Sequence, residues 1–296
     1  MATLVSLGAP PKLDAAALEA KQQALLGLLR GMGRVIVAYS GGTDSAYLAW
    51  AAAQALGDNA VAITADSASI PESHKRDAER FARENGIRHE YIDTHEFDNP
   101  DYARNNPDRC FHCKDELFTR LAEVGEARGY EHIVYGVNVD DLGDYRPGQR
   151  AAKQHDIDAP LVDAGLTKAE IRELSRLAGL ETWNRPASAC LSSRIPYGTA
   201  VTRENVRTVE KGEEAIGALG FRQFRVRYHG DLVRIEIAPE ELPRALTPEM
   251  AREFTAIFKR LGFHYITLDL QGYRQGSLNE ALPLSASPAR TAPAAD

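Results

Sequence analysis

Apolar runs and amphipathic segments alternate along the first two thirds of the chain. Short apolar and β-branched runs predict strands at residues 35–39, 59–66, 89–93 and 132–137. Segments with a helical repeat or a helix-favouring composition lie at residues 15–29, 46–56, 73–84, 114–128 and 166–178. Thr167 and Glu170 form a predicted capping box at the start of the last helix. This alternation is typical of an α/β fold, an open parallel sheet with helices on both faces.

The alternation stops near residue 199. From there the sequence predicts a helix at 204–219, a hairpin of two strands, a helix at 248–261 and a strand at 265–270. Such an order indicates a second, smaller α+β domain. We therefore expect a flexible lead-in over 1–14, an α/β domain over 15–198, an α+β domain over 199–281 and a disordered tail, rich in Ala, Pro and Ser, over 282–296.

The turn after the first predicted strand, Ser40–Ser45, has the composition of an anion-binding site. Its two glycines let the backbone approach a ligand closely, and its serines offer hydroxyl groups. The following helix directs free amides and a positive dipole end at the same place. Asp44 is a candidate N-cap of that helix. The turn has no lysine, so it is not a P-loop of the G-x-x-x-x-G-K-[ST] type.

This turn, Ser-Gly-Gly-Thr-Asp-Ser, resembles the SGGxDS signature of the PP-loop ATP pyrophosphatases. Glycine- and serine-rich turns are common between strands and helices, but here every position matches in a strand–turn–helix context. The resemblance implies cleavage of ATP between its α- and β-phosphates. Because ligands bind at the carboxyl ends of parallel strands, the same edge should gather Thr64–Asp66 and Gly136–Asp141. Thr64–Asp66 is a candidate wall for adenosine; the alternative is a plain strand end.

The chain has three cysteines, and two of them, Cys110 and Cys113, lie three positions apart. Two thiols can face one soft metal centre but cannot complete a zinc or iron–sulfur site, so Cys190 is the candidate third ligand. Three converging thiolates can hold a [4Fe–4S] cluster with one iron open to an exogenous sulfide. The alternatives are zinc bound by three cysteines and a histidine such as His112, a redox dithiol, or thiols with no chemical role.

An acidic segment follows the fourth predicted strand. Asp140, Asp141 and Asp144 fall within five residues, so they require solvent or cations as partners. Beside ATP phosphates they suit Mg²⁺, and Asp141 and Asp44 are the candidate ligands. Arg146 is a candidate partner for a phosphate or a substrate carboxylate. A solvated acidic loop is the alternative interpretation.

The hairpin of the second domain presents two arginines on one face. Side chains alternate along a strand, so Arg225 and Arg227 point the same way while Val226 faces the core. Two parallel guanidinium groups suit an anionic substrate group. The alternative is a solvated face paired to Glu236. On the preceding helix, Glu213 is expected on a mostly solvent-exposed face.

Composition narrows the class of protein. With 44% hydrophobic and 26% charged residues in 296, the chain is an ordinary globular protein of about two domains. A net charge of −7 and a pI of about 5.7 argue against a surface that coats nucleic acid. No apolar run is long enough to span a membrane, and no signal-peptide pattern is present. We expect a cytoplasmic protein that binds neither nucleic acid nor membrane.

Taken together, these motifs resemble those of the LarE family of ATP-dependent sulfur transferases. The similarity runs from about Leu25 to Asn279 in six segments: SGGTDS, RCFHCKDELF, GVNVDDLGDYRPG, RPASACLSSRIPYG, the Arg225/Arg227 strand and DLQGYRQGSLN. It implies adenylation of a carboxylate of pyridinium-3,5-biscarboxylic acid mononucleotide. Sulfur then displaces AMP and leaves a thiocarboxylate, in the biosynthesis of the nickel-pincer cofactor of lactate racemase.

The resemblance also implies roles for individual residues. Cys190 matches the cysteine that gives up its own sulfur and becomes dehydroalanine in single-cysteine members. Other members hold a cluster with three cysteines as a renewable sulfur carrier, and this chain has that pattern. We therefore expect ATP, Mg²⁺ and a [4Fe–4S] cluster as cofactors. Arg225 and Arg227, together with Arg146, are the expected substrate ligands, and Glu213 is expected in the sulfur-transfer site. The predicted ATP site consists of Ala38, Ser40, Gly41, Gly42, Asp44, Ser45, Thr64, Gly136 and Asp140.

The expected partners are a small-molecule substrate, a sulfide donor and further copies of the chain, with the second domain serving substrate binding and oligomerisation. The implied chemistry is sound, because AMP is a far better leaving group than oxide and a thiolate or sulfide is a competent nucleophile. Rival interpretations are a tRNA thiolase, an amide-forming PP-loop enzyme and a protein that senses ATP without cleaving it.

Overall fold

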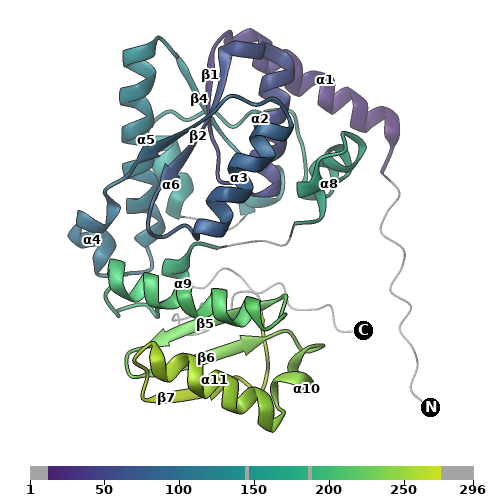
Figure 1. Ribbon diagram of the computed structural model, residues 1–296. Helices are drawn as coiled ribbons and strands as arrows, with labels where there is room; N and C mark the ends of the chain where they lie inside the picture. The colour runs from purple at the N-terminus through teal and green to yellow at the C-terminus, as the bar shows by residue number, and fades with distance from the viewer. Residues whose placement is uncertain (1–12, 144–146, 186–188, 275–296) are drawn as a thin grey trace.

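The computed structural model describes residues 13–143, 147–185 and 189–274. Its larger sheet has four parallel strands in the order β3-β2-β1-β4 (Figure 1). The strands are β1 Val35–Ala38, β2 Ala60–Asp66, β3 His89–Asp93 and β4 His132–Tyr135. This sheet confirms the predicted α/β class.

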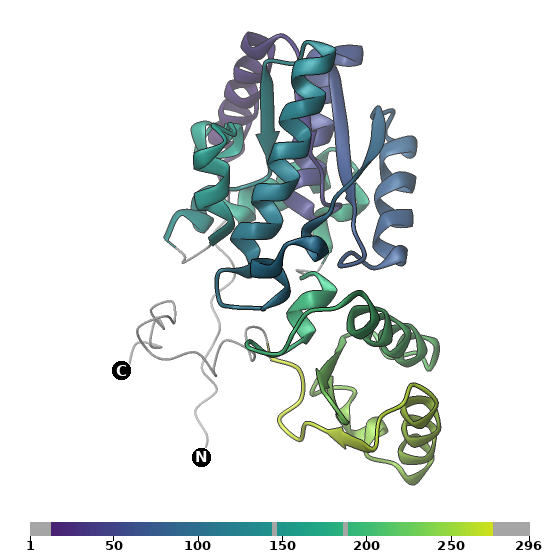
Figure 2. The same ribbon diagram turned by 90° about the vertical axis from the view of Figure 1, so that its left-hand side faces the viewer.

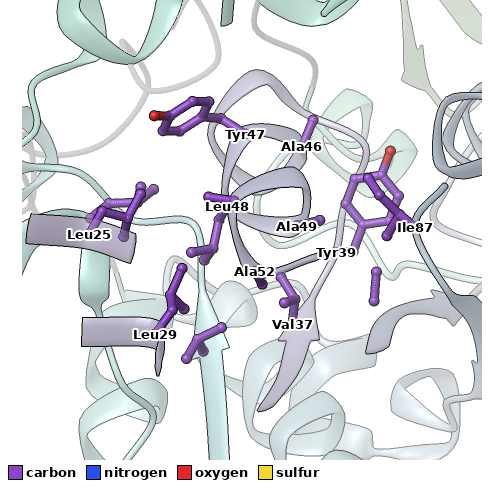
Figure 3. Packing of buried hydrophobic residues seen from close by; sticks show 14 of the residues in the cluster. Leu25, Leu29, Val37, Tyr39, Ala46, Tyr47, Leu48, Ala49, Ala52 and Ile87 are labelled. Atoms are coloured by element: carbon purple, nitrogen blue, oxygen red, sulfur yellow. The ribbon is translucent and has the colours of Figure 1, made fainter. Parts of the chain in front are cut away.

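Helices cover both faces of the larger sheet, as each strand's alternating side chains require. Val35 and Val37 of β1 belong to one buried cluster with helices α1, α2, α3 and α8, part of which is seen in Figure 3. Ile36 and Ala38 belong to a second cluster with α5 and α6. The longer helices are α1 Ala15–Met32, α2 Thr43–Leu56, α3 Glu72–Glu84, α5 Arg109–Arg128, α6 Pro147–Gln154 and α8 Lys168–Leu177, and the short ones are α4 Pro100–Ala103 and α7 Pro160–Asp163.

A smaller sheet follows, of order β5-β6-β7, and lies beneath the larger one in Figures 1 and 2. β5 and β6 form the predicted antiparallel hairpin, whereas β7 pairs with β6 in parallel. The core of this unit includes Tyr102, Leu191 and Ile195, which come from earlier segments of the chain. Its elements are α9 Arg203–Ala218, β5 Phe224–His229, β6 Leu232–Ile237, α10 Leu242–Ala245, α11 Pro248–Arg260 and β7 Tyr265–Leu268.

Two local predictions differ in outcome. The capping box at the start of α8 is confirmed, because Thr167 Oγ1 accepts from the Glu170 backbone N–H and the Glu170 carboxylate accepts from the Thr167 N–H. The start of α5 near residue 114 is wrong. This helix begins at Arg109, so that Cys110 and Cys113 lie in its first turns rather than in the preceding loop. Among the described helices, none is long and apolar enough to cross a membrane.

Candidate active site

The PP-loop connects β1 to α2 and leaves the start of that helix open. Gly42 is the N-cap residue, with φ −76° and ψ 163°, and within the described residues no side chain caps the helix. Gly41 has φ +73°, which glycine adopts readily, and a Cβ there would lie 3.3 Å from the Cβ of Ala78. The prediction that Asp44 is the N-cap is wrong, because the helix begins at Thr43. The first amides of α2 are therefore available to an anion.

Gly136, just beyond β4, lies directly against this helix start. A Cβ atom on Gly136 would lie 2.6 Å from the backbone N of Ser45 and 2.8 Å from its Cα. Both neighbours are backbone atoms, so no side-chain rearrangement can relieve the clash. Ser45 Oγ in turn lies 3.0 Å from Ser40 Oγ and donates to the carbonyl oxygen of Gly42 at 3.2 Å. Gly136 and the two serines thus hold the loop in shape.

A lysine from α8 faces the first turn of α2. Lys168 Nζ donates to Oδ2 of Asp44 at 2.6 Å, and the Oδ1 of Asp44 is buried with no hydrogen-bond partner among the described residues. Burial raises the pKa of Asp44, Lys168 opposes this change, and Asp141 adds to it. Asp140 accepts a hydrogen bond from the backbone N–H of Lys168 at 2.8 Å. The two predicted magnesium ligands, Asp44 and Asp141, are thus close enough to interact electrostatically.

The end of β2 makes structural contacts, and its role as a wall for adenosine stays a prediction. Thr64 is buried, and its Oγ1 donates to the carbonyl oxygen of Tyr39 at 2.9 Å and lies 2.9 Å from Nε2 of His89. These contacts tie β2 to the strands on either side of it. Of residues 64–66, Ala65 is the one that lines the cavity described next.

A cavity of about 230 Å³ joins the PP-loop to all three cysteines. Ser40 and the three cysteines, Cys110, Cys113 and Cys190, are all among the residues that line it. The thiols come from two distant segments, the first turns of α5 and the residue before the short helix Leu191–Arg194. Cys110 and Cys113 share one side of α5, because residues three apart on a helix are neighbours.

The surroundings of Cys110 and Cys113 disfavour the thiolate form of both side chains. Although Cys110 is partly exposed to solvent, the protein atoms packed around its thiol desolvate it and raise its pKa; a negative charge on Cys190 raises it further, and Arg109 opposes both effects. Burial also raises the pKa of Cys113, followed by the charges of Glu96 and Cys190. Three thiolates in one cavity are therefore unfavourable unless positive charge lies between them.

Buried hydrogen bonds hold the turn that carries Cys190. Arg194 is 1% exposed, and its guanidinium donates to the carbonyl oxygen of Cys190 at 3.0 Å. Arg109 donates to the carbonyl oxygen of Ser192 at 2.8 Å, and the Ser192 hydroxyl lies 2.7 Å from the hydroxyl of Tyr102. The position of Cys190 therefore depends on side chains that are distant in the sequence.

Asn105 anchors the chain beyond Cys190. It is fully buried with φ +58°, a conformation that asparagine tolerates better than most residues. Its Nδ2 donates to the carbonyl oxygens of Ile195, Pro196 and Thr199 at 3.2, 2.8 and 2.9 Å, and its Oδ1 accepts from Arg109 at 2.5 Å. One side chain thus joins the loop before α5 to the segment after Cys190.

Glu213 does not line the cavity but holds Arg194 in place. Arg194 donates to both carboxylate oxygens of Glu213, at 2.9 and 3.1 Å, and the backbone N–H of Val226 donates to the first of them at 3.2 Å. The expectation of a mostly solvent-exposed Glu213 is therefore wrong, because α9 turns this residue toward the segment of Cys190. A role for Glu213 in sulfur transfer stays a prediction.

The two arginines of β5 have different surroundings. Arg227 is 6% exposed and donates to Glu236 Oε2 at 2.8 Å and to the carbonyl oxygen of Ser193 at 3.0 Å. The alternative interpretation is therefore right about the pairing with Glu236 but wrong about solvent at this position, because Glu236 is fully buried and the segment after Cys190 covers Arg227. Arg225 is half-buried, with its Cζ 5.0 Å from the ring centroid of Tyr273. Substrate binding by either arginine stays a prediction.

Sequence reasoning did not single out the polar residues that hold this site together. These residues bind partners that are far away in the sequence: Asn105, Arg109, Lys168 and Arg194. Arg109 and Arg194 could have been found, because each lies near a cysteine in one of the two cysteine-containing segments that resemble the LarE family. Arg146 lies outside the described residues, as do residues 186–188 of the segment that carries Cys190.

No three His, Cys, Asp or Glu side chains in the described ranges are arranged to hold a single metal ion. His112 instead lies 3.6 Å from Asp108. The alternative of zinc bound by three cysteines and a histidine therefore has no preformed site among the described residues. A cluster makes a different demand, because each of its cysteines binds a different iron atom and the sulfurs need not converge on one point.

The chain is similar in sequence to three known proteins over most of its length. It is 34% identical over 269 residues to the pyridinium-3,5-bisthiocarboxylic acid mononucleotide synthase of Lactiplantibacillus plantarum, covering 90% of this chain and 96% of that protein. It is 43% identical over 265 residues to an uncharacterized protein of Synechocystis sp., covering 90% and 99%. An uncharacterized protein of Methanocaldococcus jannaschii is 27% identical over 241 residues, covering 81% and 91%. No family model matches the chain.

Proposed function

The chain belongs to the LarE family, that of pyridinium-3,5-bisthiocarboxylic acid mononucleotide synthase, and we propose that it is an ATP-dependent sulfur transferase that acts on a pyridinium dicarboxylate mononucleotide. The product is a thiocarboxylate, made for the nickel-pincer cofactor of lactate racemase.

The observation that carries this proposal is the single cavity that contains Ser40 of the PP-loop and all three thiols. A carboxylate adenylated at the loop meets sulfur without leaving the protein. A protein that only senses ATP has no use for thiols in that place. A tRNA thiolase requires a basic RNA-binding surface, which the net charge of −7 does not favour.

In the first step, a carboxylate oxygen of the substrate attacks the α-phosphorus of ATP, and the bond from that phosphorus to the bridging oxygen of the β-phosphate breaks. The open amides of α2 bind the departing pyrophosphate, and the ammonium group of Lys168 adds positive charge beside them. Asp44, through its unpartnered Oδ1, and Asp141 are the residues to hold Mg²⁺, which supplies charge neutralisation of the phosphates when bound.

In the second step, the transferable sulfur attacks the acyl carbon, and the carbon–oxygen bond to AMP breaks, so that AMP leaves. Where Cys190 supplies its own sulfur, its Cβ–Sγ bond must then break by elimination, which leaves dehydroalanine on the protein and releases the thiocarboxylate. Arg194, held by Glu213, fixes the carbonyl group of Cys190 and so the direction from which the sulfur approaches. Arg225 binds the anionic phosphate of the substrate mononucleotide at the side of the smaller sheet.

The three cysteines fit a [4Fe–4S] cluster. They line one cavity, and burial, followed by nearby negative charge, raises the pKa values of Cys110 and Cys113, so that cationic iron would stabilise their thiolates. Cys110, Cys113 and Cys190 are the ligands in this proposal. When bound, such a cluster supplies a transferable sulfide at the iron that no cysteine binds.

The experiment that tests the function combines anaerobic protein with ATP, Mg²⁺ and the pyridinium dicarboxylate mononucleotide. We expect pyrophosphate release that depends on this substrate, together with a thiocarboxylate product. Cys190→Ala should still release pyrophosphate, because the PP-loop is intact, but should form no thiocarboxylate. Parental thiocarboxylate formation by this variant would disprove the proposal.

Mass spectrometry after turnover identifies the sulfur source. An intact chain supports a renewable carrier, whereas the loss of H₂S from Cys190 indicates sacrifice of its own sulfur. The double variant Cys110→Ala/Cys113→Ala is the matched control. It should abolish thiocarboxylate formation in the first case and retain a single turnover in the second.

A further inference from the structure

One cation beside the PP-loop has no task in the reaction described above. Arg185 directly follows the short helix Glu181–Asn184, and its Nη1 donates to the carbonyl oxygen of Gly41 at 2.8 Å. A Cβ atom on Gly41 would lie 3.8 Å from the same nitrogen, so the guanidinium group packs against the turn itself. The two residues are 144 positions apart, and the sequence of the turn does not reveal this contact.

This hydrogen bond selects one orientation of the peptide group between Gly41 and Gly42. Neighbouring glycines restrict their backbone little, so their own conformational preferences do not fix that peptide group. No described peptide bond is cis, and in a trans peptide the C=O and N–H groups point to opposite sides. Since Arg185 holds the carbonyl oxygen of Gly41 on one side, the N–H of Gly42 is directed to the other.

The N–H of Gly42 is available to a ligand. It has no hydrogen-bond partner among the described residues, and Gly42 is the N-cap residue of α2, next to the open amides of that helix. A phosphate oxygen is a suitable acceptor, because it is anionic and the positive end of the helix dipole lies at the same place. The orientation of this one peptide group therefore bears on phosphate binding.

Arg185 is itself held from two sides. Its backbone N–H donates to the carbonyl oxygen of Thr182 at 3.1 Å, and its own carbonyl oxygen accepts from Nη2 of Arg172, in α8, at 3.0 Å. The carbonyl oxygen of Thr182 also accepts from the hydroxyl of Thr43 at 2.9 Å. The end of the short helix therefore supports the loop at two points, Gly41 and Thr43.

Two acidic residues balance the charge of Arg185 without binding it closely. Its Nη2 lies 3.6 Å from Asp77 and 3.8 Å from Glu181, both longer than a hydrogen bond. Arg80 binds the same two carboxylates at 3.3 and 2.8 Å, but within the described part of the chain it forms no hydrogen bond with the loop. Arg80 is thus the comparison that isolates an effect of charge alone.

We propose that Arg185 is a positioning residue for the adenylation step: it holds the carbonyl group of Gly41 and thereby aims the N–H of Gly42 at the phosphates of ATP. A donor that is already oriented stabilises the departing pyrophosphate without reorganisation during the reaction. This role differs from that of Lys168, whose ammonium group supplies charge. The inference rests on the proposed function, which assigns the pyrophosphate to the PP-loop.

The test compares the two halves of the nucleotide on the whole anaerobic protein, with Mg²⁺-pyrophosphate and adenosine titrated separately by NMR. Arg185→Met should weaken pyrophosphate binding roughly 10-fold, as for the loss of one charge-assisted hydrogen bond, and change adenosine binding by no more than about twofold. Arg80→Met is the matched control, because it removes an equal charge from the same cluster, and it should leave both affinities at parental values.

Two further measurements separate orientation from a merely structural role. Arg185→Lys retains a cationic donor and should keep pyrophosphate binding within about threefold of the parent. In the parental protein, which needs no substitution, the amide resonance of Gly42 should shift when Mg²⁺-pyrophosphate is added and stay in place with adenosine. This signal tests the inference even if Arg185→Met does not fold.

Three results would overturn the inference. They are equal losses of pyrophosphate and adenosine binding in Arg185→Met, a loss of pyrophosphate binding in Arg80→Met as large as in Arg185→Met, and a Gly42 resonance that pyrophosphate does not move. Substrate-dependent pyrophosphate release is measured separately. Its absence, alongside a retained contrast between pyrophosphate and adenosine, would refute the sulfur-transferase function but leave the positioning role of Arg185 standing.

Discussion

The two ends of the cavity are built in opposite ways. The nucleotide end consists of consecutive residues, Ser40–Ser45, and offers mainly backbone amides to its ligand. The sulfur end brings Cys110 and Cys113 together with Cys190 from a later segment, through buried side chains such as Asn105. The nucleotide end should therefore be sensitive to crowding of the backbone, and the sulfur end to the loss of single distant hydrogen bonds.

The largest expected effect comes from Gly136→Ala, which crowds the nucleotide end. The new Cβ would lie 2.6 Å from the backbone N of Ser45, so the start of α2 must move. We expect pyrophosphate release to fall at least about 100-fold, because a displacement of roughly 1 Å in a positioned site has that order of effect.

Gly27→Ala is the control for this change. A Cβ at Gly27, inside α1, meets nothing within 4 Å, and alanine favours a helix. This variant should release pyrophosphate at the parental rate and unfold at a slightly higher temperature. Normal pyrophosphate release by Gly136→Ala would contradict the idea that backbone contact shapes the loop.

Asn105→Ala addresses the sulfur end. It removes the donors to three carbonyl groups and places alanine at φ +58°, so we expect a loss of about 2–4 kcal/mol in the free energy of unfolding. Thiocarboxylate formation should fall roughly 10- to 100-fold, since Cys190 loses its position. Pyrophosphate release should change far less, which is the signature that separates the two ends.

The neighbouring residue provides the control for that experiment. Asn106 is exposed, and Asn106→Ala should leave the free energy of unfolding and both activities at parental values. If Asn105→Ala reduced pyrophosphate release and thiocarboxylate formation equally, the two ends would be one cooperative unit and the contrast between them would be lost.

The same contrast explains what could be predicted from the sequence. The four parallel strands, the capping box at Thr167 and the PP-loop depend on neighbouring residues, so a local pattern identifies them. The burial of Glu236 and the ion pair of Glu213 depend on the segment after Cys190 folding over β5, which no local pattern reveals. For the same reason, the spacing of the cysteines could not distinguish between a zinc site, an iron–sulfur cluster and a redox dithiol.

Lys168→Met is expected to have an intermediate effect at the nucleotide end. It removes the ammonium group beside Asp44 while it keeps much of the side chain's length. We expect a roughly 10-fold loss in kcat/KM for ATP in pyrophosphate release, because charge near a departing pyrophosphate stabilises the transition state. Lys153→Met, at an exposed position of α6, is the control and should be neutral. A neutral Lys168→Met would mean that the backbone amides alone suffice.

The smallest effect is expected at Glu170, which caps the start of α8 two residues after Lys168 and pairs with Lys21. Burial tends to raise the pKa of Glu170, but Lys21 and the Thr167 backbone and hydroxyl groups outweigh it, so the pKa is lowered from its ordinary value of 4.5. A lowered folded-state pKa gives stability that is complete above the unfolded-state value and is lost as pH falls through the folded-state value. Glu170→Gln should therefore cost about 1 kcal/mol near neutral pH and nothing in acid below the folded-state pKa.

Thermal unfolding of both proteins across this pH range measures the difference. Glu173→Gln, on the same helix, removes a surface pair with Arg176 and should cause no measurable change at any pH. A constant gap between Glu170→Gln and the parent down to strong acid would show that the capping geometry, rather than the charge of Glu170, holds the start of α8. In either case pyrophosphate release should fall only slightly. Helix α8 contacts the nucleotide end only through Lys168, whose side chain pairs with Asp44 and whose backbone N–H donates to Asp140. Gly136, by contrast, packs directly against the backbone of Ser45 in the loop.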